Sequence, residues 1–331
     1  MRRSLFRPFD TLLDKTVVLS YTRLGYALRE ADWDDADLEV DMSGRVCLVT
    51  GASSGLGKVT AEGLALQGAT VYMLVRNETK GQNVRHGIID RTHNKSVYLE
   101  IADLSSLASV REFASRFQDR ESRLDVLINN AGALIAERGI SIDGFELSFA
   151  TNVLGPYLLT DLLMPLLKSG APSRIVNVSS GGMYAQRLDV DDLQFEHKPY
   201  NGVIAYAQAK RAQVILTELW AEKLNDSAVT VNAMHPGWAD TPGVQKSLPT
   251  FRRLMKGGLR TPEQGADTIL WLAGAGSVAS VTGKFWLDRR ERSTHLLPWT
   301  KITIEERQRF WDTCVRLTGV TTPSTLVVEQ E

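Results

Sequence analysis

The sequence of 331 residues predicts an α/β fold: a single doubly wound parallel sheet with helices on both faces, preceded by a helical N-terminal extension. Three observations predict it. Short apolar runs alternate with segments of helical periodicity, and successive parallel strands need crossovers of this kind. A glycine-rich turn follows the first apolar run, and polar clusters follow the later ones. The unbroken alternation indicates one domain over residues 43–319, an extension over 1–42 and a tail over 320–331.

The expected strands and helices follow one another in order along the domain. Strands are predicted at 46–49, 70–75, 97–101, 126–128, 174–178 and 229–234. Helices are predicted between them from the spacing of apolar residues, at 58–67, 78–91, 105–118, 145–167 and 205–224. Ligands of such sheets bind outside the carboxyl ends of the strands. The polar residues that follow the predicted strands are therefore the candidate site.

Composition and charge narrow the class of protein. The chain is 43% hydrophobic and 23% charged, with a formal net charge of −1, which is ordinary for a globular protein and indicates no nucleic acid partner. Its two cysteines, Cys47 and Cys314, exclude a disulfide framework and favour a reducing, intracellular compartment, the cytoplasm first. Its five histidines lack metal-ligand spacing, so we expect no metal site.

The first 42 residues differ in character from the rest. Arg2, Arg3 and Arg7 stand among apolar residues, and acidic residues interrupt the apolar stretch that follows. This stretch is shorter than the roughly 20 apolar residues needed to span a bilayer. We expect a helix docked on the domain. The alternative is a membrane-surface or organelle-targeting helix, with peripheral membrane contact through the first dozen or so residues and a membrane-associated or organellar location.

The glycine-rich turn at 50–57 has the sequence TGASSGLG, between an apolar run and an amphipathic segment. Glycines let the backbone turn sharply and approach a pyrophosphate without a Cβ in the way. The N–H groups of the following helix then point at the anion, and the helix dipole favours its charge. Strand, turn and helix together predict a dinucleotide site, although the turn alone is equally compatible with an ordinary tight turn.

Tyr206 and Lys210 lie at the start of a predicted helix, four residues apart on one face. A cation next to a phenol stabilises the phenolate and lowers its pKa, which would make Tyr206 a proton donor or acceptor. Ser180 could hydrogen-bond the same substrate oxygen. Asn152 is unusual inside a helix, and relaxing that helix while holding a water near Lys210 would explain it. Taken alone, the Tyr206–Lys210 pair is also compatible with a surface contact.

Four motifs occur in a characteristic order: TGASSGLG, NNAG, VSS followed by YAQAK, and HPGW. Together they closely resemble the short-chain dehydrogenase/reductase family, over roughly residues 44–319. The resemblance implies a Rossmann-type domain with Asn152, Ser180, Tyr206 and Lys210 as the catalytic set, and its motif selects Ser180 over Ser179. The long interval between Ser180 and Tyr206, with LDVDDLQF, resembles the branch that contains the retinol dehydrogenases.

Arg76 directly follows the second predicted strand, where folds that prefer NAD often have an acidic residue. An arginine can instead bind a ribose 2′-phosphate through charge-assisted hydrogen bonds. We therefore expect NADP(H) as the cofactor, with NAD(H) as the alternative if Arg76 is only a surface residue. The predicted cofactor contacts are Gly51, Ser53, Ser54, Gly55, Leu56, Gly57, Arg76, Asp103, Leu104, Asn129, Ala131, Gly132, Tyr206, Lys210, Pro236, Gly237 and Thr241.

These observations predict an NADP(H)-dependent oxidoreductase that transfers a hydride between nicotinamide and a carbonyl or alcohol, with Tyr206 as general acid/base. The apolar segment 237–258 favours a lipophilic small-molecule substrate, but it could equally be a lid packed on its own domain. A cofactor-binding sensor or scaffold without turnover is the alternative function. An extended-branch nucleotide-sugar epimerase is disfavoured by the glycine spacing. The sequence does not decide whether the protein forms a homodimer.

Overall fold

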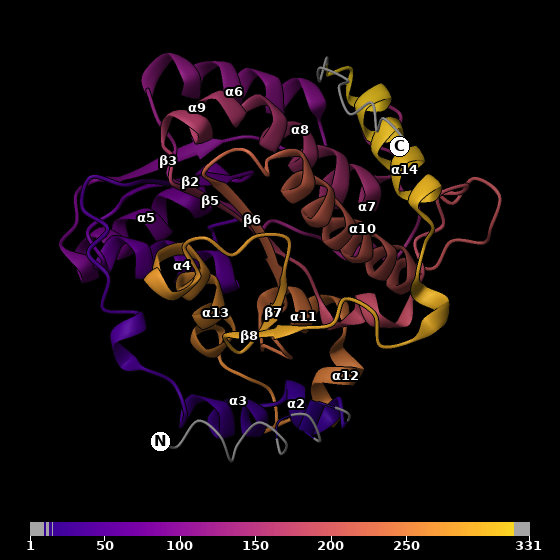
Figure 1. The fold of residues 1–331 in the computed structure, drawn as a ribbon, viewed down its shortest axis with the longest axis horizontal. Coiled ribbons are helices and arrows are strands. Elements are labelled where there is room, and N and C mark those ends of the chain that lie inside the picture. Colours follow the sequence, from indigo (N-terminus) through magenta and orange to yellow (C-terminus); the bar gives the residue numbers. More distant parts are fainter. Residues whose placement is uncertain (1–9, 11–12, 15, 321–331) are drawn as a thin grey trace.

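One sheet of eight strands runs through the protein in the order β3-β2-β1-β4-β5-β6-β7-β8 (Figure 1). The computed structural model describes residues 10, 13, 14 and 16–320. Strands β1 to β7 are parallel to their neighbours, and β8 pairs antiparallel with β7. The strands are β1 (Val46–Thr50), β2 (Thr70–Val75), β3 (Val97–Ile101), β4 (Val126–Asn129), β5 (Ser173–Val178), β6 (Val229–Met234), β7 (Phe285–Leu287) and β8 (Arg290–Arg292).

Helices cover both faces of the sheet, as the sequence predicted (Figure 1). One face packs against α6 (Leu107–Arg120), α8 (Gly155–Leu162) and α10 (Gly202–Lys223), whose apolar residues share a cluster with strand residues. The other face packs against α4 (Gly55–Leu66), α5 (Glu78–Thr92) and α13 (Pro262–Gly274). The doubly wound α/β class is therefore confirmed. The order reverses between β1 and β4, so the carboxyl ends of these strands form the crevice where ligands of such sheets bind.

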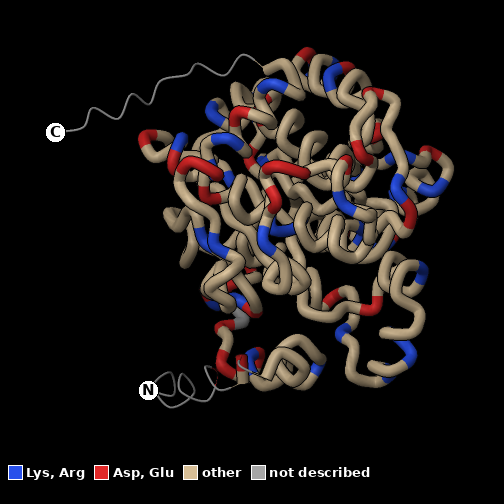
Figure 2. Tube along the Cα trace, turned by 90° about the vertical axis from the view of Figure 1, so that its right-hand side faces the viewer, with Lys and Arg blue, Asp and Glu red and all other residues tan. Residues whose placement is uncertain are grey.

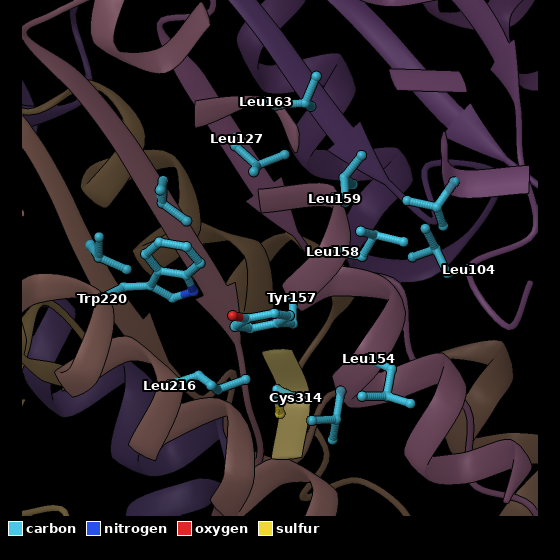
Figure 3. Packing of buried hydrophobic residues seen from close by; sticks show 14 of the residues in the cluster. Leu104, Leu127, Leu154, Tyr157, Leu158, Leu159, Leu163, Leu216, Trp220 and Cys314 are labelled. Atoms are coloured by element: carbon cyan, nitrogen blue, oxygen red, sulfur yellow. The ribbon is translucent and has the colours of Figure 1, made fainter. Parts of the chain in front are cut away.

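The central strands are buried on both faces of the sheet, which explains why their sequences are continuous apolar runs. All five residues of β1 are buried, and its side chains alternate between the two clusters, Leu48 on one face and Cys47 and Val49 on the other. Burying a large apolar side chain contributes roughly 1.5–3 kcal/mol. Figure 3 shows the first cluster, where Tyr157 of α8, Trp220 of α10 and Cys314 of α14 (Ile304–Thr318) lie close together.

The helix predicted over 145–167 is interrupted, which corrects that expectation. Its first part is α7 (Leu147–Phe149), followed by a π-helical turn over Ala150–Leu154, then α8 and a separate α9 (Met164–Ser169). The wide turn contains Asn152, whose amide nitrogen donates to the Ser148 carbonyl at 2.8 Å. Insertion of a polar side chain into the hydrogen-bond ladder is a known cause of such irregularity. The other predicted helices are present with shifted ends.

The N-terminal helical extension is also present, as α2 (Val18–Tyr21) and α3 (Arg23–Glu30). Figure 1 shows α2 close to α12 (Pro249–Leu254), which follows α11 (Pro242–Ser247) along the chain. Arg29 of α3 is fully buried and pairs with Asp10 at 2.6 Å and with Asp288 at 2.6 Å. Basic residues (Lys and Arg) and acidic residues (Asp and Glu) are both distributed over the described part of the chain (Figure 2). Among the described residues, no helix combines the length and apolarity that crossing a bilayer requires.

Candidate active site

A cavity of about 380 Å³ lies at the carboxyl ends of β1, β2, β3 and β4. Eleven of the predicted cofactor residues line it, because the glycine-rich turn, the end of β2 and the NNAG turn meet there. They are Gly51, Ser53, Ser54, Gly55, Leu56, Arg76, Asp103, Leu104, Ala131, Gly132 and Thr241. Motifs up to 190 residues apart in sequence therefore form one wall, as expected for strand ends in a parallel sheet.

The glycine-rich turn has the close contacts that require glycine. Gly51 and Gly55 have φ values of +69° and +52°, in the left-handed region. A Cβ on Gly51 would lie 2.9 Å from the Ala131 Cα, and a Cβ on Gly57 would lie 2.6 Å from the Gly51 carbonyl oxygen. Gly57 therefore packs inside the turn and does not line the cavity. These contacts bring β1, α4 and the turn after β4 together.

The first turn of α4 leaves its N–H groups available for an anion. Ser54 is the N-cap residue, but its side chain makes no capping hydrogen bond. The first four N–H groups of a helix have no partner within the helix, and here the residues Ser54, Gly55 and Leu56 at the start of α4 line the cavity. An uncapped helix of twelve residues behind a glycine cradle fits the pyrophosphate of a dinucleotide.

Arg76 lies at the far end of the cavity, next to Asp103. Its guanidinium side chain is 78% exposed and lies 4.0 Å from the Asp103 carboxylate. Asp103 in turn accepts hydrogen bonds from the backbone N–H and hydroxyl of Ser105, at 2.9 and 2.7 Å. An exposed ion pair at this distance contributes little stability, so it does not hold the Arg76 side chain in place. Arg76 can therefore turn toward a phosphate bound in the cavity.

The two asparagines of the NNAG turn lie on different sides of the end of β4, and the predicted contact Asn129 does not line the cavity. Asn129 is buried below the cavity, where its amide donates to the Thr160 hydroxyl at 3.1 Å and to the Asn177 amide oxygen at 2.9 Å. Its neighbour Asn130 lines the cavity and donates to the Thr50 carbonyl at 2.8 Å. The residues alternate along the end of β4, so adjacent asparagines point to opposite sides.

Pro236 and Gly237 also lie away from this cavity. A Cβ on Gly237 would lie 2.4 Å from the Arg260 Nε, and Gly237 has a φ of +68°. The Pro236 carbonyl accepts a hydrogen bond from Arg260 at 3.4 Å. The turn after β6 therefore faces Arg260 and the N-terminal extension.

Tyr206, Ser180 and Lys210 converge at the end of β5. Lys210 Nζ lies 5.5 Å from the centroid of the Tyr206 ring. The Ser180 and Tyr206 side chains are hydrogen-bonded to each other. Ser179 instead donates to the Lys210 carbonyl at 2.8 Å and is buried, which leaves Ser180 as the serine that faces Tyr206.

Burial shifts the pKa values of Tyr206 and Lys210 in opposite directions. It raises the pKa of Tyr206 to about 12, and the hydrogen bond with Ser180 only partly opposes this. Burial lowers the pKa of Lys210 to about 7. The Tyr206 pKa is therefore raised by burial and not lowered by Lys210 as the sequence predicted. Desolvation of the phenolate outweighs a neighbouring amine that is itself desolvated.

Lys210 is held from two sides. Its Nζ donates to the Val178 carbonyl at 2.9 Å and to the Gln213 amide oxygen at 3.0 Å. Gln213 also donates to the Asn152 carbonyl at 2.8 Å, so it connects the π-helical turn to the lysine. Sequence reasoning missed Gln213, although its position three residues after Lys210 on the same helix face could have indicated it.

Asn152 contacts the residues that end the NNAG turn, Gly132 and Ala133. Its Oδ1 accepts from the Ala133 N–H at 3.0 Å, and its Nδ2 donates to the Ala133 carbonyl at 2.9 Å. A Cβ on Gly132 would lie 2.9 Å from the Asn152 Oδ1 and 3.1 Å from the Lys210 Nζ. Asn152 and Lys210 therefore approach the same glycine at the edge of the cavity.

A nucleotide-binding crevice beside a tyrosine and a lysine defines the class of a dinucleotide-dependent oxidoreductase. The model of the short chain dehydrogenase family matches residues 45–250, and the chain belongs to that family. Like its members, it is an oxidoreductase that acts on CH–OH donors and binds NAD(P).

Two curated relatives and one solved structure illustrate the similarity. The chain is 44% identical to human dehydrogenase/reductase SDR family member 12 over 277 residues, covering 83% of this chain and 86% of the relative. It is 38% identical to human retinol dehydrogenase 13 over 294 residues, covering 85% and 86% of the two chains. A short chain dehydrogenase from Escherichia coli CFT073, solved in complex with NADPH, superposes with a TM-score of 0.62 at 26% identity, covering 76% of this chain and 99% of the other.

Proposed function

We propose that the protein is an NADP(H)-dependent carbonyl reductase or alcohol dehydrogenase for a lipophilic small molecule, with Tyr206 as general acid/base. The observation that carries the proposal is the convergence of Tyr206, Ser180 and Lys210 beside a cavity with a glycine cradle. The resemblance to retinol dehydrogenases supports a carbonyl or alcohol as the reacting group.

In the reductive direction, side chains of this protein would orient and protonate the substrate oxygen. Bound NADPH supplies the hydride that reduces the carbonyl carbon. Tyr206 donates its phenolic proton to the carbonyl oxygen, while the Ser180 hydroxyl hydrogen-bonds that oxygen and fixes its direction. A Tyr206 pKa of about 12 keeps the phenol protonated at neutral pH, which suits a proton donor. The phenolate left behind is stabilised by Ser180 and by the Lys210 amine, once that amine is protonated.

The preference for NADP(H) rests on Arg76. It borders the cavity with an exposed guanidinium, which lies 4.0 Å from the Asp103 carboxylate. A 2′-phosphate at this position would gain charge-assisted hydrogen bonds from Arg76. The NADPH complex of the E. coli relative supports the same cofactor.

The lipophilic substrate class rests on segment 237–258. Trp238 and Phe251 pack edge to face at 5.1 Å, while Leu254 is 79% exposed. Helices α11 and α12 contain no buried residue, so this segment forms a loosely packed cover next to the turn after β6. Apolar side chains in a cover of this kind can close over an apolar ligand.

The test compares Tyr206→Phe with wild type on NADPH and a panel of retinal, a medium-chain aldehyde and a steroid ketone. We expect turnover to fall by about 10²-fold or more, while the NADPH Kd stays within a few-fold. Tyr200→Phe is the matched control, because the Tyr200 hydroxyl donates to the Ile135 carbonyl at 3.0 Å, outside the cavity. A Tyr206→Phe enzyme with more than a tenth of wild-type activity would contradict the assignment. Tight NADPH binding without turnover on any carbonyl would instead favour the sensor function.

A further inference from the structure

Tyr21, the last residue of α2, packs directly on the turn that carries Ser180. Its side chain is only 5% exposed. A Cβ on Gly181 would lie 2.6 Å from the Tyr21 Cε2, so the ring occupies the space that any other residue at position 181 would need. A residue of the N-terminal extension thus contacts the neighbour of a proposed catalytic side chain.

Tyr21 also fixes the beginning of segment 237–258. Its carbonyl accepts a hydrogen bond from the Trp238 N–H at 2.8 Å. Its ring packs edge-on against His235 at 4.5 Å and against Trp238 at 5.8 Å between centroids. The next helix holds the other end of the segment, because the Arg23 N–H donates to the Gly258 carbonyl at 2.9 Å.

Two buried arginines fix the residue that precedes Tyr21. Arg29 and Arg260 both donate to the Ser20 carbonyl, at 3.0 and 2.8 Å. Both also bind the carboxylate of Asp288, Arg29 at 2.6 Å and Arg260 at 2.5 Å. Because these side chains are fully buried, the backbone before Tyr21 has little freedom to move.

We propose that Tyr21 is a positioning residue for the active site. Its ring sets the position of the Ser180 turn, and its carbonyl sets the start of segment 237–258. This inference rests on the proposed function, since it assigns Ser180 a role toward the substrate oxygen. A displacement of about 1 Å in such a group can cost up to about 10²-fold in rate.

The experiment compares three full-length variants: Tyr21→Ala, Tyr21→Phe and Tyr26→Ala. Tyr26 is the control, a tyrosine of the same extension with the same 5% exposure. Its ring contacts Trp33 at 5.1 Å and the Arg260 guanidinium at 5.6 Å, whereas the Tyr21 ring packs on Gly181. We expect Tyr21→Ala to lower kcat by about 10- to 100-fold with a much smaller change in the NADPH Kd, because only Thr241, Pro242 and Gly243 of segment 237–258 line the cofactor cavity. Tyr21→Phe keeps the ring and restores most of the activity. Tyr26→Ala lowers stability and leaves the kcat of folded enzyme within about two-fold. Equal losses of kcat in the two alanine variants would overturn the proposal.

Hydrogen exchange supplies a readout that does not require activity. Peptides covering 179–186 and 236–258 should exchange faster in Tyr21→Ala than in wild type. In Tyr26→Ala their exchange rates should equal those of the wild type. If this pattern holds while the wild type reduces no carbonyl, the proposed function fails and the positioning role stands. If both peptides exchange at the wild-type rate in Tyr21→Ala, the positioning role is refuted.

Discussion

Replacing the buried amine of Lys210 should abolish activity and should favour the folded state at and below neutral pH, where the buried amine must lose its proton or be buried charged. Lys210 is 2% exposed, and burial lowers its pKa from 10.5 to about 7. The substitution Lys210→Met keeps most of the side-chain volume and removes the titrating group. It also leaves the Val178 carbonyl and the Gln213 amide oxygen without their shared donor, a cost that does not depend on pH over the range used.

The size of the effect follows from proton linkage. The unfolded chain holds the Lys210 proton up to its ordinary pKa of 10.5, whereas the folded chain releases it near 7. Between these values the unfolded state binds more protons, so the stability of the wild type rises with pH. At about 1.4 kcal/mol per pKa unit, the stability difference between wild type and Lys210→Met should change by about 3 kcal/mol between roughly pH 7 and pH 10, in favour of the wild type at high pH.

Urea denaturation of both proteins at several pH values measures this difference. Lys198→Met is the control: the hydrogen bond to Asp189 raises the Lys198 pKa, so both states keep that proton over most of the range and its curve should run parallel to the wild type. Turnover of Lys210→Met should be lost at every pH. Parallel stability curves for Lys210→Met and wild type would show that Lys210 is charged in the folded protein, and would refute the reasoning.

Three further predictions concern the cofactor and the N-terminal extension. Arg76→Asp should shift the preference from NADPH toward NADH in fluorescence titrations, and equal wild-type affinities for the two would reduce Arg76 to a surface residue. Arg29→Met should lower the free energy of unfolding by about 1.5–3 kcal/mol, the range for lost hydrogen bonds to charged groups, because Asp288 keeps Arg260 and Asp10 keeps Arg292 as partners. Arg91→Met, which breaks an exposed pair, should cost about 1 kcal/mol or less in the same denaturation series. A truncated chain beginning at Met42 should lose thermal stability; strong vesicle binding that disappears on truncation, with stability unchanged, would contradict the docked arrangement.

The parts of the fold with local signals could be predicted from the sequence. Five of the six predicted strands are largely buried, while the edge strand β3 leaves Tyr98 and Ile101 exposed. The glycine turn after β1 has its close contacts at the glycines that the motif contains. The cavity gathers residues from several strand ends because parallel strands share one edge. Tyr206 and Lys210 could be paired because their spacing is local to one helix.

The remaining features depend on contacts that leave no local pattern. Strands β7 and β8 have three residues each, too few for a period to be recognised. The docking of Arg29 on Asp288 joins residues 259 positions apart. Whether Asn129 or Asn130 faces the cavity is decided by one residue of register at the end of β4, which the sequence NNAG does not distinguish.

The ion-pair cluster around Arg29 also has a consequence for how the protein is made. Arg29 leaves the ribosome early, but its partner Asp288 follows 259 residues later. At typical rates of synthesis this interval is on the order of tens of seconds. Throughout it, the start of the chain has no completed site on which to dock. A nascent or prematurely ended chain that lacks Asp288 therefore exposes this charged segment to chaperones and proteases.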